Sequence, residues 1–298
     1  MESAPDRGAP SGLRGWLSDL YFASLMPRSA GAPAPTDEAG TPATPEEAVD
    51  QLVKRLGERA TIDDPIFGRT SGMPTLQRYA EEVAAWLHKH EGAFEKTGFV
   101  TGSDRDVTEG MLALTFDGRR VHVPVAVVAE RRPEREVELR LYYSTKPIKG
   151  TRAVRSPLLP QDDEVAVPPP VAAHLEALSR GDEKGIIASF EAAGILRDSA
   201  GTAYAKDGDG GPLLAYYEKL FAAGNTASTP SLPQRGERGS GMEILKGARA
   251  DDGTTCALEY TVVRVHGKTV VPQAGIAVYE RGTSGLLRSV RVYQDVEV

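Results

Sequence analysis

The sequence predicts an α+β protein made of two similar domains, each a curved antiparallel sheet that wraps around helices. Three observations lead to this fold class. The 298 residues are enough for two hydrophobic cores. A helical pattern of apolar residues gives way twice to strands with alternating polar and apolar residues. The elements also follow the same order in both halves, as expected of a duplicated domain.

Residues 1–44 are expected to form a flexible N-terminal segment. Residues 27–45 consist mostly of Pro, Ala, Gly and Thr and offer little to bury. Before them, residues 16–25 (WLSDLYFASL) place apolar side chains at spacings that predict a short helix. We expect this helix to dock on the folded body, and the alternative is a recruitment peptide for a protein partner.

The first domain is expected over residues 45–146. Pro45 followed by two acids predicts the start of a helix that runs to about Arg59. A second amphipathic helix is expected over 73–94, after an extended chain and turn. Period-two patterns then predict three strands between about 97 and 145, in the segments MLALTF, RVHVPVAVVAE and EVELRLYYS.

A proline-rich connector over 147–167 separates this domain from a second one over 168–298. The second domain begins with two helical pieces over 171–194, broken at Gly181. An extended piece and a helix near 209–224 follow. Four strands complete the domain, in the segments GMEILKGARA, TTCALEYTVVRVHG, KTVVPQAGIAVYERG and LLRSVRVYQDVEV.

Short segments match between the two halves. IDDPIFG corresponds to LRDSAG, which aligns Asp64 with Asp198. VAVVAE and ELRLYYS in the first half correspond to GIAVYE and SVRVYQD in the second. Because duplication commonly places a homodimer's interface within one chain, we expect the two copies to pack sheet to sheet as a pseudo-dimer.

This order of elements, with an aspartate before Pro65 in TIDDPIFG, resembles the nuclear transport factor 2-like superfamily. That superfamily includes the SnoaL-like polyketide cyclases and the ketosteroid isomerases. The resemblance implies cone-shaped barrels with a pocket for a small, largely apolar molecule. Asp64, and Asp198 in the second copy, fall where the isomerases carry their general base. His174 falls at the position of the isomerases' helix-borne tyrosine, and Gln273 lies nearest to their second acid.

The resemblance therefore gives a site hypothesis for the second copy. Asp198 would act as the base, with Gln273 and His174 as hydrogen-bond partners, because a positioned donor stabilises the charge that proton transfer creates. Asp64 would serve in the first copy. The implied function is binding of a small hydrophobic molecule, with isomerisation or cyclisation that needs no cofactor. The alternative for each aspartate is a structural role in a turn.

The composition also bears on which partners and cofactors we expect. The net charge is −7 and no dense run of Lys and Arg occurs, so we expect no nucleic-acid partner. Cys256 is the only cysteine, and the histidines are scattered, so we expect neither a bound metal nor a cofactor. No segment is apolar enough for a membrane span or a signal core, which predicts a cytoplasmic protein. The alternative function is a non-catalytic, pseudo-dimeric scaffold or protein-interaction module.

Overall fold

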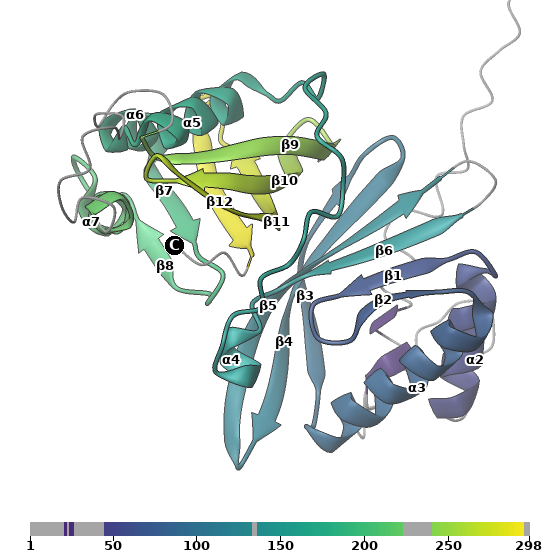
Figure 1. Cartoon of the computed structure of the whole chain (residues 1–298). Coiled ribbons are helices and arrows are strands. Elements are labelled where there is room, and N and C mark those ends of the chain that lie inside the picture. Colours follow the sequence, from purple (N-terminus) through teal and green to yellow (C-terminus); the bar gives the residue numbers. More distant parts are fainter. Residues whose placement is uncertain (1–20, 23, 27–44, 133–135, 223–239, 295–298) are drawn as a thin grey trace, which may run out of the picture.

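The computed structural model describes residues 21–22, 24–26, 45–132, 136–222 and 240–294. Two copies of one α+β arrangement occupy this chain, the first in blue and teal and the second in green and yellow (Figure 1). The predicted fold class and the duplication are confirmed. No helix among the described residues combines the length and apolar character that crossing a bilayer requires.

The first copy begins with helix α2 (Pro45–Leu56), the short hairpin of β1 (Thr61–Asp64) and β2 (Gly68–Ser71), and helix α3 (Met73–Lys89). Four longer strands follow: β3 (Ala93–Thr101), β4 (Arg105–Phe116), β5 (Arg119–Arg131) and β6 (Val137–Tyr142). The short helix α4 (Lys146–Lys149) then opens the connector.

The second copy repeats this order, with one extra short helix at its start. It comprises α5 (Pro169–Arg180), α6 (Glu183–Ala188), β7 (Phe190–Arg197), β8 (Ala203–Ala205), α7 (Gly211–Ala222), β9 (Met242–Asp251), β10 (Thr255–Val265), β11 (Lys268–Arg281) and β12 (Leu287–Tyr293). The strand orders β2-β1-β6-β5-β4-β3 and β8-β7-β12-β11-β10-β9 are identical in topology.

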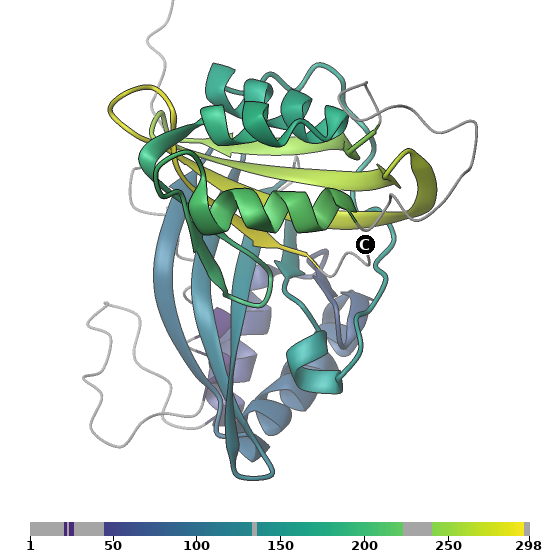
Figure 2. The ribbon, with the colours of Figure 1, turned by 90° about the vertical axis from the view of Figure 1, so that its left-hand side faces the viewer.

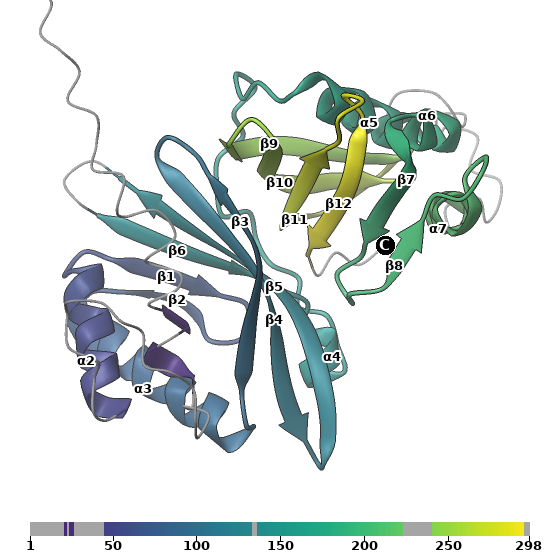
Figure 3. The same ribbon diagram turned by 180° about the vertical axis from the view of Figure 1, so that it is seen from behind.

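The sheets differ in two respects from the predicted antiparallel barrels. Each contains one parallel pair, β1 with β6 and β7 with β12, because the first hairpin of each copy joins the edge of the last strand. Each sheet is also open, since its terminal strands pair on one side only. The helices cover one face of each curved sheet, which gives a cone with a helical filling rather than a closed barrel (Figure 3).

Two helices end earlier than the sequence pattern predicts. Helix α3 stops at Lys89, and β3 starts at Ala93 where helix was expected to 94, because Glu91 takes a positive φ of 50° and breaks the helical backbone. Strand β3 was therefore missed. Likewise, β7 starts at Phe190 inside the segment predicted as helix, where pairing with β12 outweighs helix propensity.

The two sheets pack face to face through their outer surfaces. Figure 2 shows the strands of the second copy lying across those of the first. Alternation along each strand sends one set of side chains into the cone and the other set to this interface. The interface core is small and consists of aliphatic side chains and one tyrosine from each copy: Val100, Val107, Ala126, Val128 and Tyr142 from the first copy, and Ala250, Ala257, Ala274, Ile276, Val278 and Tyr293 from the second. The predicted pseudo-dimer is thus observed.

Candidate functional site

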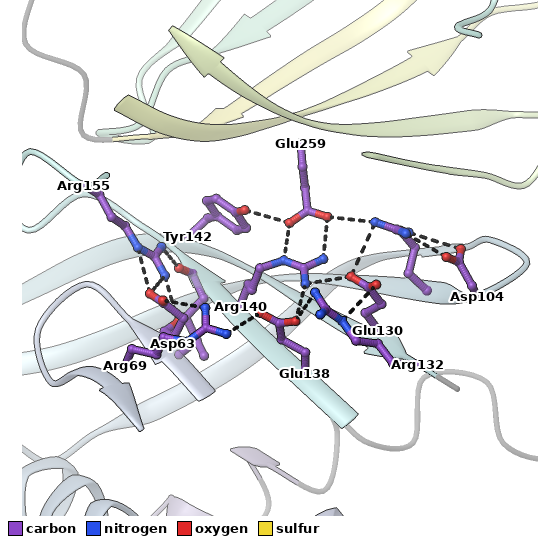
Figure 4. A network of polar contacts seen from close by, with 12 residues as sticks. Asp63, Arg69, Asp104, Glu130, Arg132, Glu138, Arg140, Tyr142, Arg155 and Glu259 are labelled. Carbon is purple, nitrogen blue, oxygen red and sulfur yellow. Dashed lines mark hydrogen bonds and ion pairs between the residues drawn. The ribbon is translucent and has the colours of Figure 1, made fainter. Parts of the chain in front are cut away.

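A buried carboxylate of the second copy joins the two sheets at one end of the interface. The Glu259 carboxylate accepts hydrogen bonds from Arg140 Nε at 2.6 Å, Arg140 Nη2 at 2.8 Å and the Tyr142 hydroxyl at 2.7 Å (Figure 4). Both donors lie on β6 of the first copy. A two-pronged guanidinium–carboxylate pair fixes the relative orientation of its partners as well as their distance.

The other end of the interface repeats this arrangement with the copies exchanged. The Glu109 carboxylate of the first copy accepts from Arg291 Nε at 2.7 Å, Arg291 Nη2 at 2.8 Å and the Tyr293 hydroxyl at 2.6 Å. Glu109 and Glu259 are 150 residues apart, and the arginines and tyrosines are each 151 apart. The contacts are therefore reciprocal, as at a twofold homodimer interface.

The surroundings of Arg140 form an extended buried ion network. Its side chain is fully buried, and its Nη1 lies 2.7 Å from Glu130 and 3.5 Å from Glu138. Arg105 approaches Glu259 to 3.5 Å. Burial acts to raise the pKa of Glu259, but the adjacent Arg140 guanidinium more than offsets this and holds that pKa below its usual value.

The corresponding end at Arg291 is hollow. A cleft of about 500 Å³ opens there between the copies, against about 30 and 50 Å³ for the cavities in the two cones. Its wall includes Glu109, Met111 and Pro124 from the first sheet. The second copy contributes the end of β7, the turn after it and the end of β12, with Arg197, Asp198, Gly201, Arg291, Val292 and Tyr293.

Asp198 borders this cleft, in the turn between β7 and β8, and its carboxylate is turned to Tyr204, whose ring packs against the core of the second cone. Its Oδ1 accepts from the backbone N–H groups of Ala200 (3.0 Å) and Thr202 (2.9 Å), and its Oδ2 accepts from the Tyr204 hydroxyl (3.1 Å). Gly201 in the same turn has a φ of +86°, and a Cβ there would come within 3.2 Å of Pro124 Cγ. Glycine thus lets the turn approach the first copy closely. The hydrogen bonds of Asp198 therefore give it a structural role in a turn, which was the alternative to its role as a base.

His174 and Gln273 do not accompany Asp198. His174, on α5, is buried in the second cone and places its Nδ1 3.1 Å from Ser189 Oγ. Burial lowers the pKa of His174 to about 4. Gln273 is buried and pairs in register with Val262, whose side chain belongs to the same core, so both lie on the cone face of the sheet. The cavity left in this cone is about 50 Å³.

Asp64 is buried in the first cone. Its Oδ1 accepts from the Tyr143 hydroxyl at 2.8 Å and from the backbone N–H of Ile66 at 2.7 Å, and its Oδ2 accepts from the Tyr79 hydroxyl at 3.1 Å. Burial, and then the charge of Asp64, raise the pKa values of both tyrosines. Neighbouring Asp63 points the other way and meets Arg155 of the connector, its Oδ1 3.2 Å from Arg155 Nε.

Residues of the N-terminal segment fill the mouth of the first cone. Residues 21, 22, 24 and 25 are helical and buried. The Tyr21 hydroxyl lies 2.6 Å from that of Tyr79, and the Phe22 ring stacks on Phe94 with centroids 3.5 Å apart. A cavity of only about 30 Å³ remains beside Asp64, room for about one water molecule. The expected docking holds for these residues, whereas residues 16–20 and 23 lie outside the described part.

The ion pairs between the copies and the cleft were not predicted from the sequence. One signal was available, because the matching strings ELRLYYS and SVRVYQD both contain Arg-x-Tyr, which supplies Arg140 with Tyr142 and Arg291 with Tyr293. The partner acids Glu109 and Glu259 occupy matching positions on β4 and β10. Within the described ranges, no group of three or more His, Cys, Asp or Glu side chains is arranged to hold a metal ion.

Comparisons with known proteins give matches among solved structures alone. Neither the protein-family models nor the curated proteins give a match. Solved structures do match, and the printed descriptions of some name an NTF2-like protein or a ketosteroid isomerase-like fold. One is the epoxide hydrolase/cyclase-like enzyme SalBIII of pyran ring formation in salinomycin, with 21% identity, a TM-score of 0.26, and coverage of 31% of this chain and 75% of the enzyme.

A second is a ketosteroid isomerase-like protein from Catenulispora acidiphila solved with trimethylamine, with 14% identity, a TM-score of 0.33, and coverage of 47% of this chain and 93% of that one. A third is an NTF2-like protein of unknown function from Cytophaga hutchinsonii, with 6% identity, a TM-score of 0.27, and coverage of 31% and 83%. Each covers a third to a half of this chain, about one copy. Likenesses this distant carry no argument about activity.

Proposed function

We propose that this protein binds a small molecule in the cleft between its two copies. The observation that carries the proposal is the contrast in cavity size: about 500 Å³ in the cleft, against about 30 and 50 Å³ in the cones. Small-molecule sites typically occupy about 300–1,000 Å³. Side chains, including those of residues 21–25, already fill the cones, so the cleft is the place in the described chain with room for a ligand.

In a catalytic form of this site, Asp198 would be the residue that transfers the proton. Of the four residues predicted from the sequence, Asp198 alone lines the cleft, and His174, Gln273 and Asp64 belong to the cone interiors. A cofactor-independent isomerase or cyclase is the catalytic form of the proposal, with Asp198 as the base. Geometry supports binding more directly than catalysis, because Asp198 also holds the turn through its three accepted hydrogen bonds.

The second candidate function is a non-catalytic scaffold. It is favoured by the filled cones and by the reciprocal ion pairs, which join the two copies to each other. In that case the cleft would be a by-product of packing two curved sheets, and no small molecule would stabilise the fold.

A thermal-shift screen against steroids, aromatic polyketides, terpenoids and small acids separates the two functions. A ligand that binds the native state raises the melting temperature by an amount that grows with the logarithm of its concentration relative to Kd. We expect a ligand whose effect disappears in Met111→Trp, which fills the cleft, and persists in Asp64→Asn, which changes the first cone. Asp198→Asn then reports whether the aspartate contributes to binding.

Two results would contradict the proposal. No stabilisation by any compound class would favour the scaffold. A shift that survives Met111→Trp would place the ligand outside the cleft. Leu159→Ala, a change on the opposite side of the interface, is the matched control for nonspecific loss of stability.

A further inference from the structure

The two ends of the interface form equivalent grooves, and the chain itself occupies one of them. Glu109, Met111, Pro124 and Tyr293 of the open cleft correspond to Glu259, Thr261, Ala274 and Tyr142, which line a residual cavity of about 10 Å³. Leu158 and Leu159 of the connector line that small cavity as well. The connector therefore fills one groove with two apolar side chains, and its counterpart is the open cleft.

The connector also places a charge and a backbone contact in the closed groove. The Arg155 guanidinium pairs with the Asp63 carboxylate and donates to the Asp63 carbonyl oxygen at 2.8 Å. The Arg155 carbonyl accepts from the Ala274 N–H at 2.9 Å. An occupant of this groove is thus recognised by one ion pair, one main-chain hydrogen bond and two apolar side chains.

The open groove presents the opposite charge at the equivalent place. Asp63 lies opposite Arg140 across the β1–β6 pair, and Arg197 lies opposite Arg291 across the β7–β12 pair, so Arg197 takes the position of Asp63. Arg197 is exposed and lines the cleft, and its guanidinium has no hydrogen-bond or ion-pair partner among the residues that the structure describes. An unpaired guanidinium at a cleft wall is suited to a carboxylate, which it can bind through two parallel hydrogen bonds.

Two other differences between the grooves indicate what kind of ligand the open one can hold. Pro124 replaces Ala274 and has no N–H, so the main-chain hydrogen bond that holds the connector cannot form. This favours a small molecule over an extended peptide. Thr255 replaces Arg105, since each lies opposite the matching acid, Glu280 or Glu130, and the shorter side chain leaves space in the cleft.

We propose that the open cleft binds an amphipathic carboxylate, with its anion on Arg197 and its apolar body against Met111 and Pro124, where the connector's leucines lie in the equivalent groove. This inference rests on the proposed function and names the ligand class of the same site. The charge contact sets the preference for an acid, and the apolar wall supplies the buried area.

The test is a fluorescence titration with 1-pyrenebutyrate and its neutral analogue 1-pyrenebutanol. Wild-type protein should bind the acid at least about 10-fold more tightly than the alcohol, which corresponds to about 1.4 kcal/mol. Arg197→Ala should abolish this preference and leave binding of the alcohol unchanged. Thr255→Arg, which introduces the side chain found in the closed groove, should abolish binding of both.

The contrary outcomes are distinct. Equal binding of acid and alcohol, both lost in Thr255→Arg, would overturn the carboxylate assignment and keep the cleft as the site. Binding of neither compound, or binding unaffected by Thr255→Arg, would count against the cleft and so against the proposed function. Tighter, Arg197-dependent binding of a peptide of residues 153–161 carrying Arg155→Glu would overturn the small-molecule assignment in favour of a peptide.

Discussion

The two ends of the inter-copy interface share the same Arg–Glu–Tyr arrangement and a second arginine–glutamate pair, Arg140 with Glu130 and Arg291 with Glu280, but they differ in other neighbours. At the Arg140 end, further charges and the connector close the groove. At the Arg291 end, Thr255 and Ser289 occupy the places of Arg105 and Glu138, and the groove stays open. A homodimer would have to keep both ends identical. Duplication within one chain allows one end to stabilise the pair while the other remains available for binding.

The largest expected effect comes from removing the central charge of the closed end. Arg140→Ala removes the cation shared by Glu259, Glu138 and Glu130 and leaves buried Glu259 with only the more distant Arg105; removing one partner of a buried ion pair typically costs about 3–5 kcal/mol. Arg291→Ala should cost less, because its side chain is 20% exposed and solvent reaches that end. Urea unfolding of both variants measures the difference. Equal losses would mean that the two ends do not differ energetically.

The comparison extends to the cone interiors, because residues of the N-terminal segment are buried in the first cone, whereas the connector residues before α5 are only partly buried against the second core. Phe22→Ala removes a buried ring that stacks on Phe94 and should destabilise the protein by about 3 kcal/mol. Phe221→Ala, in the core of the second cone, is the matched change. If Phe22→Ala left the unfolding midpoint unchanged, residues 21–25 would not be part of the first core.

The second cone should make stability depend on pH through His174. Its folded-state pKa of about 4 lies below the ordinary value of 6.5, so the unfolded chain binds the proton more readily. Stability is therefore fully present above about pH 6.5 and is lost as pH falls toward 4, by about 2–3 kcal/mol at pH 4.5.

Unfolding measured from pH 7.5 to 4.5 in wild type and His174→Gln isolates this contribution from that of His266, whose pKa burial also lowers. The difference between the two proteins should shrink as pH falls. A constant difference would show that the pKa of His174 is the same in the folded and unfolded states, so that burial does not lower it.

The smallest expected effect on stability is that of Thr255→Arg, which makes the open end resemble the closed one. The new side chain would lie beside Glu109 and Glu280, as Arg105 lies beside Glu259 and Glu130. We expect a change within about 0.5 kcal/mol, measured by thermal unfolding. A loss of several kcal/mol would mean that the open end cannot accommodate the closed arrangement.

The sequence predicted the fold through features that act locally. Alternating strands, the helix start at Pro45 and the break at Gly181 depend on near neighbours, and the structure agrees with them. The predicted end of α3 and start of β7 were wrong: the positive φ of Glu91 breaks the first helix, and pairing with the distant strand β12 decides the start of β7.

The site was harder to predict, because a cleft between copies depends on relative placement. Asp198 was predicted as the base of a cone pocket, yet it lines the cleft with Arg197. Residue spacing relates Asp198 to His174 only within one copy and contains no information on which face of the sheet meets the partner. The repeated Arg-x-Tyr was the one sequence feature that marked the interface.

The most direct test compares thiol reactivity at two equivalent positions, Met111→Cys in the open cleft and Thr261→Cys in the closed groove. Native Cys256 serves as an internal control, because it is buried and burial raises the pKa of its thiol to about 12. Modification by an uncharged maleimide should be fast at position 111 and slow at 261. Equal rates at the two positions would contradict the claim that one end of the interface is open and the other closed.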